Sequence, residues 1–507
     1  MPSAFKETAK RVARGLVGAV SPALLRRIQL ARARAMYLEE PSHGPHRLLL
    51  EPTTGCNHKC LMCWDHSPRL AKQTPACHMP FDRVAALLRD MAAMGTEEVW
   101  LAGRGEPLIH PKAKDILKLI GDLGMRSIIT TNAGVLTEEL ADQLCEWSLQ
   151  QLSISIDSGT PGTYAKVHGG PPEDRARILK LIKRISQRTN GKPRLLVSMV
   201  LSQANFREML DLVRDAIEYG ATGVVIGGMR PVPFDSTDLA LSEGDWSQVR
   251  ADLTAAREIA QTANVHLATE NIPLGHAPRS QVWPYADMAC FIGHRFTVID
   301  VAGTVHGCCT CVNALGSLDD ASFRDVWHSR PYRLYRKILS EMPTAGLTPP
   351  QCECRYGCGH VPENAALQRE LAFTFPQSLP PSEFVTRVAL VHALCEHLDA
   401  VLPPLARDFT FADLAPADAS AVSRLRQTGI MGGGSMDGLN LFEPRRLVAR
   451  GEFEDILARA LAASHVDTEK AKSLIAQSRT GSGHPAEPLR QRDMDAWLSR
   501  LASGLQS

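Results

Sequence analysis

The chain has 507 residues, enough for about three domains and more than one hydrophobic core. Hydrophobic residues make up 44% of it and charged residues 22%, which is typical of a folded protein and excludes global disorder. The 56 lysines and arginines balance the 55 aspartates and glutamates, and no run of 18 apolar residues occurs, so we expect neither a nucleic-acid partner nor a membrane span.

Residues 1–46 are predicted to form a basic helical segment. Lys6, Lys10 and Arg14 precede an apolar stretch, as they do in a secretion signal. However, Pro22 interrupts that stretch, and no convincing cleavage site follows it. The segment therefore favours a cytoplasmic protein whose N-terminal helix packs on the next domain or touches a membrane surface.

Three cysteines lie close together after the apolar stretch at 48–50, which predicts a strand. Cys56, Cys60 and Cys63 have the spacing C-x3-C-x2-C, which indicates metal binding rather than disulfides in a chain without an export signal. Such thiolates can hold three irons of a [4Fe–4S] cluster and leave the fourth iron open to a small molecule. The alternative is a structural zinc site that adds His58 or His66.

Apolar strands then alternate with amphipathic helices for more than two hundred residues. Strands are expected at 47–52, 97–102, 126–131, 151–157, 194–201 and 222–227, with a possible seventh at 265–269. Helices are expected at 79–94, 112–123, 137–147, 174–188, 205–219 and 242–263. This repeat predicts an α/β fold with parallel strands, in a full barrel, a partial barrel or a doubly wound sheet.

A glycine-rich turn and several polar side chains follow these strands. Gly105, Glu106 and Pro107 end the turn after the second strand, where glycine lets the backbone approach a ligand and a carboxylate can accept hydrogen bonds from an ammonium group. Asn132 follows the third strand and Asp157 the fourth, so both are candidates for binding hydroxyl groups. Turn or helix-capping roles fit these two residues equally well.

These features resemble the radical S-adenosylmethionine (radical SAM) family. The resemblance rests on the three-cysteine group after a first strand, on the turn at 103–107, which is similar to the family's Gly-Gly-Glu-Pro motif, and on 131–134, which is similar to its Thr-Asn-Gly segment. It implies an open partial (β/α)6 barrel with cofactor and substrate at the C-terminal ends of the strands. It also implies that S-adenosylmethionine (SAM) binds the open iron and yields a 5′-deoxyadenosyl radical, which abstracts a hydrogen atom from the substrate.

The resemblance also suggests which residues bind SAM. Glu106 is expected to bind its ammonium group, and Met62 stands where many members carry an aromatic residue against the adenine. His168 replaces an arginine of the family and is expected to be an ordinary surface histidine. No catalytic residue is identified. The expected cofactor-binding residues are Met62, Gly105, Glu106, Pro107, Asn132, Ser155 and Asp157.

Seven of the thirteen cysteines lie between residues 290 and 358. Their order is similar to the SPASM or twitch extension of radical SAM enzymes, which holds one or two auxiliary [4Fe–4S] clusters. The compact spacing C-x-C-x3-C departs from the full SPASM pattern, so one auxiliary cluster is better supported than two. A zinc site is the alternative. The leading candidate ligands are Cys290, Cys308, Cys354 and Cys358. Cys352 is either an alternative to Cys354 or a partner of Cys309 or Cys311 at another position.

Four segments are therefore expected. They are the basic helical segment at 1–46, the partial barrel at 47–275, a small cysteine-rich domain at 285–362 and a mostly helical extension at 375–507. Within the third, a hairpin turns at Gly303 and a helical linker follows it. Within the fourth, the glycines at 432–434 are expected to form a flexible connector.

The family resemblance implies an oxidoreductase or maturase. Its substrate is expected to be a peptide or a small biosynthetic molecule, changed by oxidation, epimerisation or cross-linking. An electron donor such as flavodoxin or ferredoxin is the expected partner. A zinc-stabilised binding protein without enzymatic activity is the alternative, and metal analysis separates the two.

Overall fold

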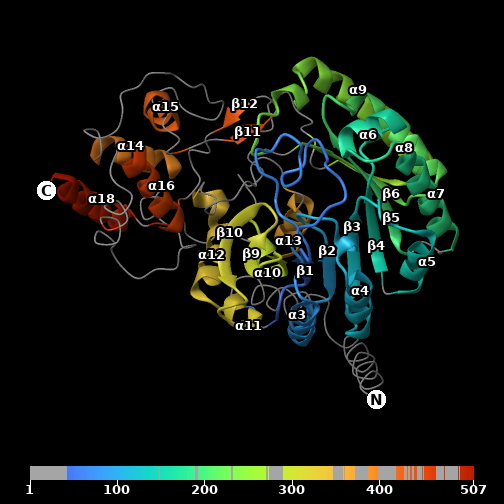
Figure 1. Ribbon diagram of the computed structural model, residues 1–507, viewed down its shortest axis with the longest axis horizontal. Coiled ribbons are helices and arrows are strands. Elements are labelled where there is room, and N and C mark those ends of the chain that lie inside the picture. Colours follow the sequence, from blue (N-terminus) through green and yellow to red (C-terminus); the bar gives the residue numbers. More distant parts are fainter. Residues whose placement is uncertain are drawn as a thin grey trace.

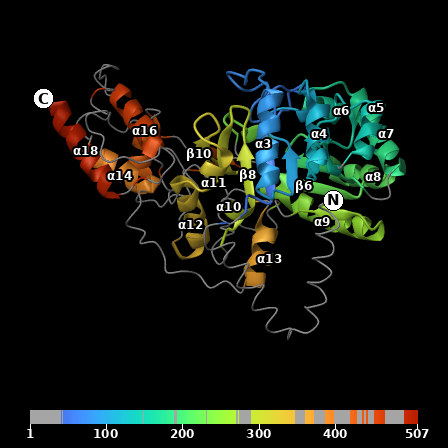
Figure 2. The same ribbon diagram turned by 90° about the horizontal axis from the view of Figure 1, so that it is seen from below.

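The protein is described from a computed structural model (Figures 1 and 2). The described residues are 43–147, 149–188, 192–229, 232–269, 289–345, 360–371, 386–397, 418–427, 434–436, 439–441, 450–463 and 491–506, with positions 41, 272, 358, 431, 448, 473 and 489. The predicted N-terminal helix and the cysteines at 352 and 354 lie outside them. None of the described helices combines the length and the apolar character needed to cross a membrane.

The centre of the molecule is a ten-stranded sheet with the order β10-β9-β8-β1-β2-β3-β4-β5-β6-β7. The strands from β8 to β7 in this order pair in parallel, and β9 and β10 pair antiparallel. The first seven are β1 (Arg47–Leu50), β2 (Glu98–Leu101), β3 (Arg126–Thr131), β4 (Leu149–Ser155), β5 (Arg194–Leu201), β6 (Gly223–Gly228) and β7 (His266–Ala268). Each lies within two residues of its predicted bounds, so the expected α/β fold with a partial barrel is confirmed.

Helices connect these strands and follow the outer side of the curved sheet (Figure 1). In α3, Val84, Leu87, Leu88 and Met91 repeat at helical spacing and are all buried, which explains why this segment packs as an amphipathic helix. The connecting helices are α3 (Phe81–Ala93), α4 (Ala113–Asp122), α5 (Glu138–Glu146), α6 (Pro161–His168), α7 (Glu173–Arg188), α8 (Met209–Glu218) and α9 (Glu243–Thr262). The helix α6 was not predicted, and its C-terminal end reaches the first cysteine group.

The cysteine-rich segment continues the central sheet instead of forming a separate one. Its first strand β8 (Phe296–Ile299) pairs in parallel with β1, and β9 (Thr304–Cys308) returns antiparallel to it. The predicted turn at Gly303 is confirmed, because this residue has a φ of +84°. A helical linker was predicted after this turn, but Cys311–Ser317 forms the strand β10 instead. β10 pairs with β9 through two register shifts. The helices α11 (Phe323–Trp327) and α12 (Arg330–Ala345) follow it.

The C-terminal extension has a hydrophobic core of its own. Its buried residues between 390 and 498 form one cluster that contains no residue of the central core. Its helices are α14 (Arg387–His397), α15 (Ala419–Gln427), α16 (Arg450–Ala463) and α18 (Gln491–Gln506). A flexible connector was predicted at 432–434, but Gly434 begins the strand β11 (Gly434–Met436), which pairs with β12 (Leu439–Leu441). The extension lies beyond α12, at the opposite end of the molecule from α7 (Figures 1 and 2).

Candidate functional site

The first cysteine group lies on the loop that leaves β1 at the C-terminal edge of the parallel strands. Cys56, Cys60 and Cys63 are all partly buried, and burial raises the pKa of each thiol. Backbone N–H groups of Asp65 and His66 donate to the Cys63 sulfur at 3.4 and 3.2 Å. Such donors stabilise a thiolate, which is the form that binds iron.

The glycine-rich turn after β2 packs directly against this cysteine loop. The backbone N–H of Glu106 donates to the carbonyl of Gly55 at 2.8 Å. A Cβ atom on Gly105 would lie 2.4 Å from that carbonyl oxygen and 2.6 Å from the carbonyl oxygen of Thr53. The backbone at Gly105 therefore closely approaches the loop that carries the cysteines. Its predicted approach to a ligand stays a prediction.

The Glu106 carboxylate connects the ends of β2 and β3. It is buried, and burial raises its pKa. It accepts hydrogen bonds from the Thr131 hydroxyl and the Asn132 backbone, both at 2.7 Å, and from the Leu108 backbone at 3.1 Å. Pro107 is buried at the start of the short helix η1 (Pro107–Ile109). Since a carboxylate accepts about four hydrogen bonds, roughly one position is left for the predicted ammonium contact.

The Asn132 side chain also reaches the cysteine loop. Its Nδ2 donates to Asn57 Oδ1 at 2.9 Å and to the Cys56 sulfur at 3.7 Å, and its Oδ1 accepts from the Gly134 backbone at 2.7 Å. Met62 lies in the turn that the Cys63 N–H closes on the Cys60 carbonyl at 3.0 Å. Its side chain is half-buried.

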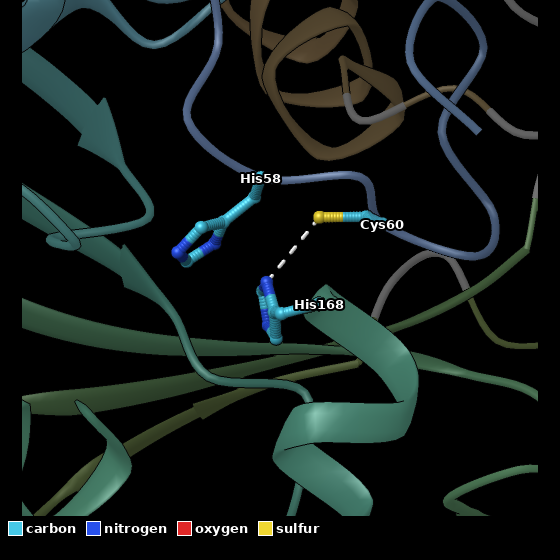
Figure 3. Close-up of side chains that lie close together, drawn as sticks. All are labelled: His58, Cys60 and His168. Atoms are coloured by element: carbon cyan, nitrogen blue, oxygen red, sulfur yellow. Dashed lines mark hydrogen bonds between the residues drawn. The ribbon is translucent and has the colours of Figure 1, made fainter. Parts of the chain in front are cut away.

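The histidine at 168 lies beside a cysteine of this loop, as Figure 3 shows. Its Nδ1 is 3.3 Å from the Cys60 sulfur, and its Nε2 is 3.1 Å from Asp157 Oδ2. The prediction of a surface histidine is wrong, because His168 is 1% exposed. The end of α6 holds it there, since backbone N–H groups of Lys59 and Leu61 donate to the last carbonyls of that helix at 3.1 and 2.7 Å.

The carboxylate of Asp157, which follows β4, is engaged on both oxygens. Its Oδ1 accepts from the Val200 backbone at 2.6 Å, and its Oδ2 faces His168. Ser155, the last residue of β4, lies with its hydroxyl 3.4 Å from that of Ser198. The Asp157 carboxylate therefore faces the buried histidine, while Ser155 and Ser198 are paired on the neighbouring strands β4 and β5.

A second histidine, His58, lies beside His168, with the ring centroids 5.5 Å apart (Figure 3). Burial and the nearby His168 lower its pKa to about 4, so it is neutral near pH 7. The ligand atoms of His58, Cys60 and His168 lie within 4.8 Å of one another. His66, the other histidine of the predicted zinc alternative, has its Nε2 2.8 Å from the carbonyl oxygen of Thr54 and does not belong to this group.

A group of charged side chains occupies the neighbouring strand ends. Glu51 directly follows β1, and Asp300 directly follows β8. Burial and the negative charge of Asp300 raise the pKa of Glu51 to about 7. Arg104 donates to Asp65 at 2.6 and 2.8 Å and partly offsets this effect. Glu51 was not among the predicted site residues. The one feature of the sequence that indicates it is its position at the end of a strand.

The described cysteines of the second group surround the start of α13 (Val361–Leu371). Cys290, Cys308 and Cys358 are buried. Asn364 Nδ2 donates to the Cys290 sulfur at 3.6 Å, and the His360 backbone donates to the Cys358 sulfur at 3.4 Å. This arrangement, like that of the first group, places N–H donors on the sulfurs of buried cysteines.

A histidine that the sequence analysis did not consider completes this second group. The ligand atoms of Cys308, Cys309 and His360 lie within 4.8 Å of one another. Burial lowers the pKa of His360, but hydrogen bonds to the Cys308 thiol and to Glu363 outweigh it and raise the pKa to about 9. The only signal for His360 in the sequence was its place two residues after the last cysteine of the compact group.

Comparison with known proteins agrees with both sites. The model of the radical SAM superfamily matches residues 50–216, and the model of the SPASM iron–sulfur cluster-binding domain matches residues 290–359. This chain is a radical SAM enzyme with a SPASM domain. The zinc-stabilised scaffold is not favoured, and the two domains imply SAM, a [4Fe–4S] cluster that binds it and auxiliary iron–sulfur clusters. Three partly buried thiols, with N–H donors on the sulfurs of Cys56 and Cys63, fit such a cluster.

The relatives of this radical SAM enzyme have names that indicate different reactions. The AdoMet-dependent heme synthase of Methanosarcina barkeri is 22% identical over 310 residues, which cover 59% of this chain and 85% of that protein. The tungsten-containing aldehyde ferredoxin oxidoreductase cofactor-modifying protein of Pyrococcus furiosus is 22% identical over 340 residues, or 62% of this chain and 89% of that protein. The crystal structure of Streptococcus suis SuiB bound to S-adenosylmethionine has a TM-score of 0.50 and 19% identity, and the match covers 70% of this chain and 82% of SuiB. This last similarity concerns the fold alone.

Proposed function

We propose that this radical SAM enzyme abstracts a hydrogen atom from a substrate bound over the C-terminal edge of its parallel strands. Cys56, Cys60 and Cys63 would hold the SAM-binding cluster, and Cys290, Cys308 and Cys358 would hold an auxiliary one. When bound, the first cluster and SAM supply the 5′-deoxyadenosyl radical. The observation that carries the proposal is the three-thiol loop, which the turn after β2, Asn132 and the end of α6 all contact.

The protein's own residues would position these groups and exclude water. The buried Glu106 fixes the backbone of Asn132, which in turn donates to the Cys56 sulfur. His168, at the C-terminal end of α6, contacts the Cys60 sulfur through Nδ1 and faces Asp157 with Nε2. Because the donors are held by the fold, they do not have to reorganise when charge changes at the site.

The proposed substrate is a small biosynthetic molecule or a peptide, changed by oxidation, epimerisation or cross-linking. The names of the two relatives above, a heme synthase and a cofactor-modifying protein, favour a small molecule or cofactor precursor. The peptide alternative would give a role to the C-terminal extension, which has a hydrophobic core of its own and is a candidate for binding a peptide. A flavodoxin or ferredoxin is the proposed electron donor, and the cytoplasm the proposed location.

Anaerobic SAM cleavage tests the first step of this proposal. The reconstituted chain, reduced with dithionite in the presence of SAM, should release 5′-deoxyadenosine even without substrate. Cys60→Ala should abolish the product, whereas Cys145→Ala should not, because Cys145 lies on α5, outside both cysteine groups. A reconstituted chain that binds stoichiometric zinc, or that contains iron and sulfide but leaves SAM intact, contradicts the proposal.

A further inference from the structure

The start of α13 brings the buried cysteines of the second group together. The His360 backbone donates to Cys358, and Asn364, one turn later, donates to Cys290. The Asn364 Oδ1 also accepts from the Phe291 backbone at 2.7 Å, which fixes the amide against the segment that carries Cys290. One helical turn thus contacts cysteines that lie 68 residues apart, with its N–H groups directed at their sulfurs.

The His360 side chain faces the third cysteine from the same turn. Its ligand nitrogen lies within 4.8 Å of the Cys308 sulfur. The ring packs against Phe296, with centroids 5.2 Å apart, and the residue is only 9% exposed. This buried imidazole lies beside the buried Cys308 thiol, on the helical turn whose N–H groups contact the sulfurs of Cys290 and Cys358. It therefore supplies a fourth ligand of a type that iron–sulfur clusters accept in place of cysteine.

A carboxylate orients the ring. Nδ1 of His360 lies 3.8 Å from Glu363 Oε2, and the other oxygen of Glu363 forms an ion pair with Arg295, with Nε 2.9 Å away. Histidines that bind metals commonly direct their second nitrogen at a carboxylate, which fixes the tautomer and the ring plane. With Nδ1 facing Glu363, Nε2 is the nitrogen that remains for a metal.

We propose that His360 is a ligand of the auxiliary cluster, binding one iron through Nε2 while Cys290, Cys308 and Cys358 bind the other three. This inference rests on the proposed auxiliary cluster and replaces Cys354 of the sequence-based ligand set with a histidine. Glu363 is then a positioning residue. Cys309 is exposed and adjacent to Cys308, and it is not part of this set.

The test isolates the auxiliary cluster and looks for nitrogen at its iron. In a full-length chain that carries Cys56→Ala, Cys60→Ala and Cys63→Ala, the iron that remains belongs to the second group. After anaerobic reconstitution and reduction, pulsed electron paramagnetic resonance should detect a strongly coupled nitrogen. Growth with 15N-histidine should convert that coupling from 14N to 15N.

Variants assign the coupling to one residue. His360→Ala should remove it and reduce the iron content from four per cluster to three or fewer. His360→Cys should remove it but keep the four irons, with a lower reduction potential, because thiolate replaces imidazole. His306→Gln is the matched control: His306 lies on β9, two residues before Cys308, and its Nε2 faces Asp300 at 3.5 Å, so the coupling should persist.

Three results overturn the assignment. A full cluster without histidine coupling shows that His360 at most donates a hydrogen bond to the Cys308 sulfur. Stoichiometric zinc bound by Cys308, Cys309 and His360 shows a different metal site. A triple variant that folds but retains no metal shows that there is no auxiliary cluster, and this also contradicts that part of the proposed function. The first result, in contrast, leaves the proposed function intact.

Discussion

Replacing Gly105 with alanine tests whether the turn after β2 supports the cysteine loop. The new Cβ would meet the carbonyl oxygens of Gly55 and Thr53 at 2.4 and 2.6 Å. Cβ atoms essentially never approach other atoms closer than 3.0 Å, so the two backbones must separate by about 0.6 Å. The neighbours are backbone atoms of the loop that carries the cysteines, so no flexible side chain can move aside.

The energetic effect follows from two terms. Forcing a methyl group into a packed contact costs about 1–3 kcal/mol. The hydrogen bond from Glu106 N–H to the Gly55 carbonyl is displaced at the same time, which adds about 1 kcal/mol. A total of roughly 2–4 kcal/mol lowers the equilibrium constant for docking of the loop about thirtyfold or more, at 1.4 kcal/mol for each factor of ten.

Hydrogen exchange measures this local change better than global unfolding, because the chain contains two separate cores. In Gly105→Ala, the amides of Glu106, Lys59 and Leu61 should exchange at least tenfold faster, and reconstitution should yield less iron. Gly162→Ala is the control. Gly162 lies in α6 with no atom within 4 Å of a new Cβ, so alanine should leave these amides unchanged. Normal exchange and full iron in Gly105→Ala would refute the reasoning.

Three further predictions concern single side chains. His168→Phe keeps a ring at this position but removes the nitrogen beside the Cys60 sulfur. The midpoint potential of the first cluster should therefore fall by roughly 40 mV in a redox titration. An unchanged potential contradicts a hydrogen bond from His168 to the Cys60 sulfur. Because the pKa of Glu51 in the fold is raised to about 7, its contribution to stability is full below pH 4.5 and is lost as the pH rises through 7. Glu51→Gln should therefore be more stable than the wild type at pH 8, by up to about 3 kcal/mol in urea unfolding, and equal to it at pH 4.5. Arg336→Lys should destabilise the SPASM segment by about 2–3 kcal/mol in the same assay. The reason is that lysine cannot both stack on the Trp327 ring, 4.1 Å away, and donate to two carbonyls. Equal stability would show that the stacking contributes little.

The sequence was informative where a short stretch of chain determines its own structure. Alternating apolar strands and amphipathic helices located every strand from β1 to β7 within two residues. β10 was missed because its sequence, Cys-Val-Asn-Ala-Leu-Gly-Ser, does not alternate clearly. It forms a strand because β9 pairs with it through bulges. Pairing of this kind depends on the partner strand and not on the local pattern.

Contacts between distant segments could not be predicted from motifs. Cys60 and His168 are 108 residues apart, and only the docking of the end of α6 on the cysteine loop brings them together. His360 was overlooked for a similar reason, since nothing local shows that the start of α13 lies against Cys308. Glu106, in contrast, was found from its motif, but its hydrogen bonds to Thr131 and Asn132 were not.

The pairing of β1 with β8 explains how the two cysteine groups keep their relative position. Leu50 pairs with Ile299 at the end of both strands, and the Glu51 N–H donates to the Ile299 carbonyl at 2.9 Å. The loop with the first cysteines and the turn at Asp300 therefore start from adjacent points on one edge of one sheet. Since this pairing is made by backbone hydrogen bonds, it fixes the spacing between the two sites more firmly than a contact between independent domains would.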